Sequence, residues 1–143
     1  MDEEDNAKGE LKRVDHLIYV TLKYTRTVDV IRNIIEKLIS TLNHKSNDIF
    51  LNLLDNKKVS SVPSVPLVRM KDLEKQFSKD KKVKDIVDFY ILLKKIYNAD
   101  YRAKEEYRKN VTLVTREKEV NIEMLKNYYE LTQDYVEHLN TLE

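Results

Sequence analysis

The stretch KYTRTVDVIRN at residues 23–33 carries two arginines and an aspartate at helical spacing, an arrangement that could bind an anion. On a helix, Asp29 would lie one turn from Arg26 on one side and from Arg32 on the other. A guanidinium held by a carboxylate presents a planar, always-charged fork to phosphate. The alternative is a solvated helix face, whose ion pairs contribute only about 0.2–0.5 kcal/mol each. The sequence leaves both interpretations open.

A second cluster, KKIYNADYRAKEEYRK at residues 94–109, interleaves basic residues with tyrosines. Aromatic rings beside cations can stack on bases while the cations contact phosphates, as in many single-strand-binding sites. Tyr97 and Tyr101 are one helical turn apart, so packing into a core is the alternative explanation. Together the two clusters supply the candidate residues for binding an anion or a nucleic acid: Arg26, Asp29, Arg32, Tyr97, Tyr101, Arg102, Arg108 and Lys109.

Other kinds of functional site find little support in the sequence. A P-loop or a dinucleotide fingerprint needs several glycines, and Gly9 is the only one. The chain has no cysteine, and its three histidines show no metal-ligand spacing. His138 follows Asp134 by one helical turn, which would orient an imidazole as a base, although a surface pair explains the spacing as well. We therefore expect no catalytic residue, no cofactor and no metal site.

Composition and periodicity predict helices. One glycine and two prolines in 143 residues, with 36% charged and 41% hydrophobic residues, are typical of a helix bundle. Apolar residues recurring every three or four positions predict long helices over about 9–44, from 83 onwards and from a cap at Thr115 onwards. Shorter helices are expected at 49–54, capped by Asn47, and at 70–77. The predicted fold is an all-α antiparallel bundle of three long helices plus one or two short helices, forming a single domain over 1–143.

Three segments are expected to connect or flank these helices. Residues 1–8 read as a flexible acidic leader, and residues 55–68 as a loop because Pro63 and Pro66 force extended predecessors. YRAKEEYRK, at 101–109, can continue a helix. VTLVT, at 111–115, has β-branched character, yet no partner strand is evident, so we interpret it as a helix end or an extended linker. No apolar run approaches the ~20 residues of a membrane span, and we expect a cytoplasmic protein with no membrane partner.

Charge is distributed unevenly along the chain. Residues 57–84 hold nine Lys or Arg against three acids, whereas residues 117–143 hold two Lys against seven acids. Such a molecule could attract a polyanion at one end, or place its acidic helix against the basic segment of another copy. First and last helices of ~30 residues would be ~40–50 Å long, more than a compact bundle of this size covers. The helix length favours a homodimer, whereas a solvated lysine-rich surface also explains the charge pattern.

The segments DFYILLKKIYNADY at 88–101 and EEYRKNV at 105–111, placed before a last helix, resemble the HEPN superfamily of helical-bundle domains. The resemblance implies an up-and-down bundle that dimerises, with roles in RNA cleavage, nucleotide-related chemistry or toxin–antitoxin pairs. Ribonuclease members use an arginine followed four to six residues later by a histidine. Arg108 is the nearest match, but Asn110, Thr112 and Leu113 follow it and no histidine appears before His138. Catalysis by that route is therefore not implied.

Three hypotheses for function remain. The leading prediction is a dimerising interaction or assembly module without catalysis. The alternative is a domain that binds RNA or single-stranded nucleic acid, and a degenerate nuclease is the third. The expected partners are accordingly a second copy of the chain and RNA or another polyanion.

Overall fold

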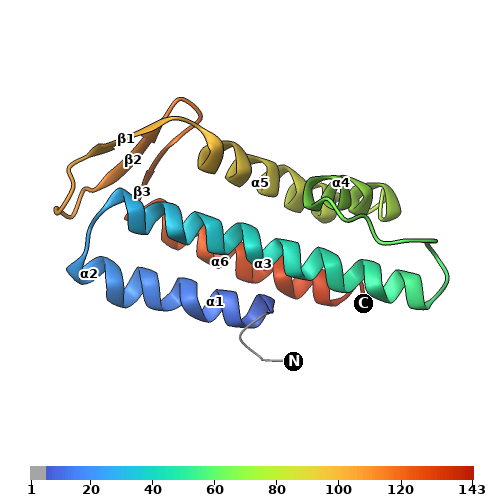
Figure 1. Cartoon of the computed structure of the whole chain (residues 1–143). Helices are drawn as coiled ribbons and strands as arrows, with labels where there is room; N and C mark the ends of the chain where they lie inside the picture. The colour runs from blue at the N-terminus through green and yellow to red at the C-terminus, as the bar shows by residue number, and fades with distance from the viewer. Residues whose placement is uncertain (1–5) are drawn as a thin grey trace.

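The computed structural model describes residues 6–143 and shows long helices lying side by side, with a small sheet at one end (Figure 1). The helices are α1 (Ala7–His16), α2 (Leu22–Tyr24), α3 (Val28–Asp55), α4 (Pro66–Gln76), α5 (Lys81–Asn98) and α6 (Ile122–Asn140), and the π-helical turn η2 (Leu17–Thr21) joins α1 to α2. The strands are β1 (Tyr101–Lys104), β2 (Thr112–Thr115) and β3 (Glu119–Asn121). Most of the expected acidic leader lies outside the described residues. Asn6 already caps α1, accepting a hydrogen bond from the Gly9 N–H at 2.9 Å.

Helix α3 is the centre of the fold, with α1, α6, α5 and α4 packed around it. Its apolar residues recur at helical spacing over the whole length, so it can bury side chains against all four neighbours. Removing each such side chain from water contributes roughly 1.5–3 kcal/mol. Its largest fully buried side chains are Ile31, Ile34, Ile35, Leu38, Leu42, Ile49 and Phe50.

The prediction of a single helix over residues 9–44 is wrong in two places. The helix is interrupted before α3, and α3 continues beyond residue 44. The helix stops at Tyr24, and Thr27 is extended and caps α3 by accepting a hydrogen bond from the Val30 N–H at 3.3 Å. The polar residues 43–47 do not interrupt the helix, and Asn47 caps no new one, because α3 continues to Asp55. These polar residues hold neighbouring elements instead: the buried Arg69 of α4 donates to Ser46 Oγ at 3.0 Å.

The all-α prediction is wrong over residues 101–121, which form a three-stranded antiparallel sheet in the order β1-β2-β3. VTLVT contributes the central strand, with Leu113 opposite Val120 on one side and Ala103 on the other. YRAKEEYRK is the first strand and the loop after it, not a helix. All four residues of β1 are exposed and only Val120 of β3 is buried, so neither strand shows the apolar alternation by which strands are recognised.

The last helix begins later than the sequence predicted. Thr115 caps a tight turn instead, where its Oγ1 accepts from the Lys118 N–H at 2.9 Å. Asn121 is the actual cap of α6, and its Oδ1 accepts from the Met124 N–H at 2.9 Å. The residues between the two caps are consequently free to form β3.

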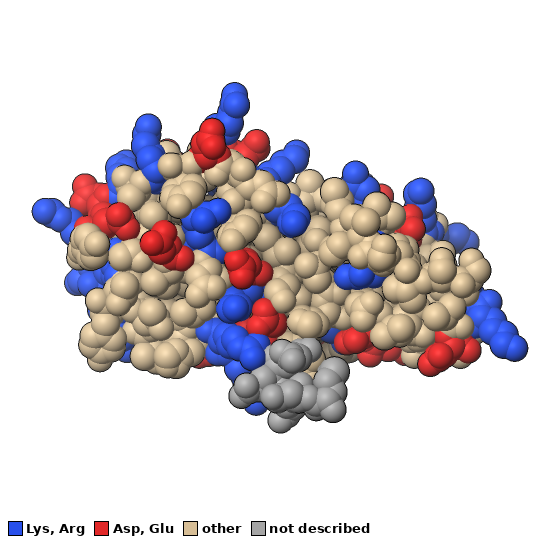
Figure 2. All heavy atoms as spheres, viewed as in Figure 1, with Lys and Arg blue, Asp and Glu red and all other residues tan. Residues whose placement is uncertain are grey.

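The oppositely charged segments meet within the chain. Lys82 Nζ lies 2.9 Å from Asp134 Oδ2. His138 Nε2 lies 2.8 Å from Oδ2 of Asp80, the residue that caps α5, so His138 pairs with Asp80 rather than with Asp134. Both signs of charge are interspersed over the described residues of the face in Figure 2. This internal pairing uses part of the charge that could have joined two copies. None of the helices in residues 6–143 is both long and apolar enough to cross a bilayer.

Candidate functional site

The candidate site lies where the loop after β1 packs on the break between α2 and α3. We call residues 105–111 the docked loop and residues 25–27 the helix break. The Tyr107 N–H donates to the Arg26 carbonyl oxygen at 2.7 Å, and the Val28 N–H donates to Glu106 Oε2 at 3.0 Å. Glu106 thus completes the N-terminus of α3 with a carboxylate, which the positive end of the helix dipole favours.

The docked loop holds two non-glycine residues in the left-handed region of backbone space. The φ angle is 56° at Glu105 and 69° at Tyr107. This conformation costs an L-residue about 1–2 kcal/mol, and such strain persists only where surrounding contacts impose it. The fully buried Val111 anchors the end of the loop in the core. The fold therefore constrains Tyr107 to an unfavourable conformation at an exposed position.

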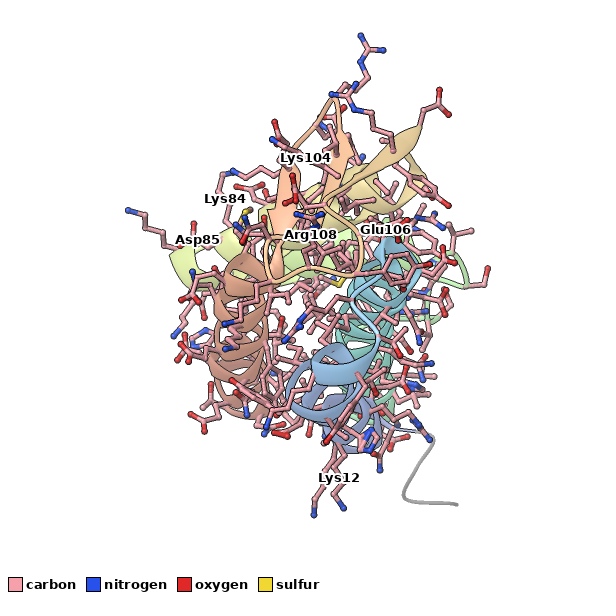
Figure 3. The ribbon with its side chains drawn as sticks, turned by 90° about the vertical axis from the view of Figure 1, so that its left-hand side faces the viewer. Lys12, Lys84, Asp85, Lys104, Glu106 and Arg108 are labelled. Atoms are coloured by element: carbon pink, nitrogen blue, oxygen red, sulfur yellow. The ribbon has the colours of Figure 1, made fainter. Side chains whose placement is uncertain are left out.

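Two tyrosines and several cations are presented to solvent around this contact. The side chain of Tyr107 is 76% exposed and that of Tyr24, just before the helix break, is 86% exposed. Arg108 is also exposed, and its 3.9 Å approach to Glu105 is a weak surface pair. Figure 3 shows Lys104, Glu106 and Arg108 at the sheet end of the molecule, on the side facing the viewer. Tyr24 falls in the apolar periodicity that predicts a helix over 9–44, but it is exposed rather than buried.

A hollow of about 370 Å³ opens between the helix break, the docked loop and the first turn of α6. Arg26 and Lys109 supply its cations, and among residues 6–143 neither side chain lies within ion-pair distance of a carboxylate. Two of the predicted site residues, far apart in the sequence, are thereby brought together. The hollow is lined by Arg26, Lys109, Asn110, Thr112, Asn121, Ile122 and Glu123.

Arg32, Tyr97 and Tyr101 form a separate structural lock. The guanidinium carbon of Arg32 lies 4.5 Å from the ring centroid of Tyr97 and 4.4 Å from that of Tyr101. Arg32 also donates to the Tyr97 carbonyl oxygen at 2.9 Å, and Tyr97 Oη donates to Glu36 Oε2 at 2.6 Å. That hydrogen bond, helped by burial, raises the pKa of Tyr97. Because its guanidinium contacts two tyrosine rings and the Tyr97 carbonyl, Arg32 joins α3 to α5 and β1 and is already engaged within the fold.

The remaining predicted residues lie apart from this lock. Asp29 is exposed in the first turn of α3, and among the described residues no ion pair joins it to Arg26 or Arg32, so the predicted bracing is absent. Arg26 cannot take part in a helical ladder because it lies in the helix break. Arg102 is exposed on β1, opposite Val114.

Glu106 and the polar wall of the hollow are features of the candidate site that were not predicted from the sequence. One available signal was Thr27 followed by Asp29, a residue pair typical of a helix start. It would have placed the helix break beside Arg26. Asn110, Thr112 and Asn121 gave no comparable signal, because only the sheet brings them together.

Two other kinds of site have less support. No group of three or more His, Asp or Glu in residues 6–143 is placed to hold a metal ion. A larger hollow of about 750 Å³ lies between α1, α3 and α6, where Lys12 and Lys45 face Asp15 and Asp48. Lys8 also lines this hollow, whose mixed charges, of which Lys45 already pairs with Glu143, indicate no particular ligand.

Comparison with known proteins adds no relative: no family model matches the chain, and no curated protein and no solved structure was found to be similar. The resemblance to HEPN domains accordingly stays a prediction.

Proposed function

We propose that this protein binds single-stranded nucleic acid, RNA in the first instance, at the docked loop and the helix break. The observation that carries the proposal is Tyr107, which the fold holds in a left-handed conformation and leaves 76% exposed between acidic and basic neighbours in the sequence. Strain at an exposed aromatic residue supports a role in binding, because packing in the core would not require it.

The chemistry around Tyr107 suits a single strand. A base stacked on an exposed tyrosine contributes roughly 1–3 kcal/mol and requires no particular sequence. Arg108 and Lys109 follow directly, Arg26 lies on the other side of the contact, and Arg102 and Lys104 are exposed on β1. The ring stacks on a base while these cations contact flanking phosphates.

The proposal includes no catalytic step. Glu106, the carboxylate nearest the contact, is already used as the acceptor for the Val28 N–H. His138 is paired with Asp80 and packs between α6 and α5, away from the docked loop. Arg108 therefore has no histidine beside it to share acid–base work, which matches the incomplete arginine–histidine motif.

Salt dependence of RNA binding tests the proposal. Fluorescence anisotropy of a labelled oligouridine should show saturable binding that weakens with salt, and removing one phosphate-binding cation should make the slope of log affinity against log salt shallower by about 0.7. Arg102→Ala and Arg108→Ala should each show this change. Lys57→Ala and Lys58→Ala, at the far end of α3, are matched controls and should not. Absence of saturable binding at low salt, or equal changes in the controls, would overturn the proposal.

Self-association is a second candidate, supported by exposed apolar side chains on two neighbouring helices. Several large ones are exposed on the C-terminal part of α3 and on the start of α4, which pack on each other: Leu51, Leu54, Val65, Leu67 and Val68. Large exposed apolar side chains are a feature of interfaces where they form a patch. Sedimentation velocity should show a concentration-dependent dimer that Leu51→Glu abolishes. A monomer at every concentration would remove this candidate and leave RNA binding unaffected.

A further inference from the structure

The hollow beside the docked loop has the composition of a phosphate site. Arg26, half-buried in the helix break, and Lys109, on the loop, both line it without a carboxylate partner in the described chain. Hydrogen-bonding side chains complete the wall, from Asn110, Thr112 and Asn121. A planar guanidinium together with an ammonium and neutral donors is a typical setting for phosphate oxygens.

The first turn of α6 adds to the positive potential of the hollow. Ile122 and Glu123, the first two residues of this 19-residue helix, line the hollow. The N–H groups at these positions have no acceptor within a helix, whereas the Met124 N–H is already satisfied by Asn121. A helix N-terminus carries about half a positive charge, which acts here in addition to the two cations.

The charge balance and size distinguish between two kinds of phosphate. Arg26, Lys109 and the helix terminus, less the carboxylate of Glu123, give a net charge of about +1.5. A phosphomonoester carries about −1.5 to −2 at neutral pH, whereas a phosphodiester within a strand carries one negative charge. At about 370 Å³ the hollow lies near the lower end of ligand-pocket volumes, ~300–1,000 Å³, and has room for a terminal phosphate and its sugar.

We propose that the hollow binds a phosphomonoester, supplied by the end of a nucleic-acid strand whose terminal base stacks on Tyr107. This inference rests on the proposed function, because it places the terminal phosphate of the same bound strand in the hollow. The Tyr107 N–H bond to the Arg26 carbonyl ties the aromatic platform to the cation that lines the hollow. The protein is then a reader of phosphorylated strand ends, and internal stretches of the strand bind more weakly.

The test compares three forms of one oligouridine, carrying a 5′-phosphate, a 3′-phosphate or hydroxyls at both ends, by calorimetry with the full chain. One phosphorylated end should bind roughly 10- to 100-fold more tightly than the hydroxyl form, as hydrogen bonds between charged groups of ~1.5–3 kcal/mol would give. Arg26→Ala and Lys109→Ala should abolish this preference. Lys104→Ala, an exposed cation of β1, is the matched control and should retain it. Arg26→Lys keeps the charge but not the fork, and should keep part of the preference if the variant remains folded by circular dichroism.

The possible outcomes separate this inference from the proposed function. If all three oligonucleotides bind equally, the hollow does not select phosphomonoesters and the inference is wrong, while RNA binding stands. If none binds, the proposed function fails, and phosphorus NMR of uridine 5′-monophosphate decides the chemistry of the hollow. Binding of that nucleotide that disappears in Arg26→Ala would support a phosphomonoester site for free nucleotides. No binding of any probe would overturn both proposals.

Discussion

The carboxylate of Glu106 accepts a hydrogen bond from the backbone N–H of Val28 at 3.0 Å, across 78 residues of sequence. This contact closes the N-terminus of the central helix with a side chain from the loop after β1. The first turn of α3 and the position of the docked loop are therefore coupled. We expect a change that releases one to weaken the other.

Glu106→Ala should lower the free energy of unfolding by about 1–2 kcal/mol, since it removes both a cap and a favourable charge at a helix N-terminus. Glu106→Gln keeps the acceptor without the charge and should lose about half as much. Urea unfolding monitored by circular dichroism measures both values. Glu130→Ala, an exposed acid on α6, serves as the control. Equal stability of Glu106→Ala and the parent chain would show that the loop is not docked in solution.

Replacing Arg32 should affect stability and leave intrinsic RNA binding unchanged. Arg32→Met should cost about 1–3 kcal/mol, because the guanidinium lies between two tyrosine rings and bonds the Tyr97 carbonyl. Arg32→Lys should retain only part of the stability that Arg32→Met loses, because an ammonium cannot stack on the tyrosine rings as a planar guanidinium does. A double-mutant cycle with Tyr101→Leu should give a coupling energy of about 0.5–2 kcal/mol. A coupling near zero would contradict the lock.

Tyr107→Asn should make the protein more stable. Asparagine tolerates the left-handed conformation better than tyrosine, and the tyrosine ring, 76% exposed, contributes little packing. We expect the free energy of unfolding to rise by about 0.5–1 kcal/mol, part of the strain of ~1–2 kcal/mol. Tyr24→Asn, at a helical position with a similarly exposed ring, should show no such gain. A large loss of stability in Tyr107→Asn would indicate that the ring packs in solution.

The pairing of Asp80 with His138 should make stability fall at acidic pH. Burial opposes ionisation of Asp80, but hydrogen bonds from His138 and from the Val83 and Lys82 N–H groups outweigh it, so the pKa of Asp80 is lowered. The unfolded chain therefore binds the proton more readily, with an ordinary pKa of about 3.9. The stabilisation is present above that value and is lost as pH falls through the lower folded pKa.

Asp80→Asn keeps a capping side chain and removes the titration. Thermal unfolding followed from neutral pH to below pH ~4 should consequently show a smaller acid-dependent loss in this variant than in the parent chain. Identical pH profiles for the two proteins would contradict the assignment of the effect to Asp80.

The sequence predicts those elements of the fold whose pattern lies within one segment, and it misses those that depend on pairing with a distant segment. The apolar residues of α5, such as Ile86 and Leu93, recur at helical spacing and do form a buried face. The helix break was missed because the apolar spacing continues in phase from Tyr24 to Val28, although Tyr24 is exposed. The sheet was missed because β1 and β3 are short and polar, and they form only by pairing with β2.

The geometry of the candidate site could not be predicted from the sequence. Basic residues and tyrosines were predicted as the groups that could bind a phosphate or a base, and that chemistry stays a prediction. Which of them face solvent together is decided by tertiary contacts: Arg32 is locked between two rings, whereas Arg26 and Lys109 share a hollow. No local pattern distinguishes these roles, because both arginines lie in the same polar stretch.

The most direct test of the central claim is the affinity of Tyr107→Asn for a short labelled oligouridine, relative to the parent chain at the same salt concentration. Loss of one stacked base, worth roughly 1–3 kcal/mol, predicts binding about 5- to 150-fold weaker in a variant that is at least as stable as its parent. Unchanged affinity in that folded variant would contradict a nucleic-acid site built around the docked loop.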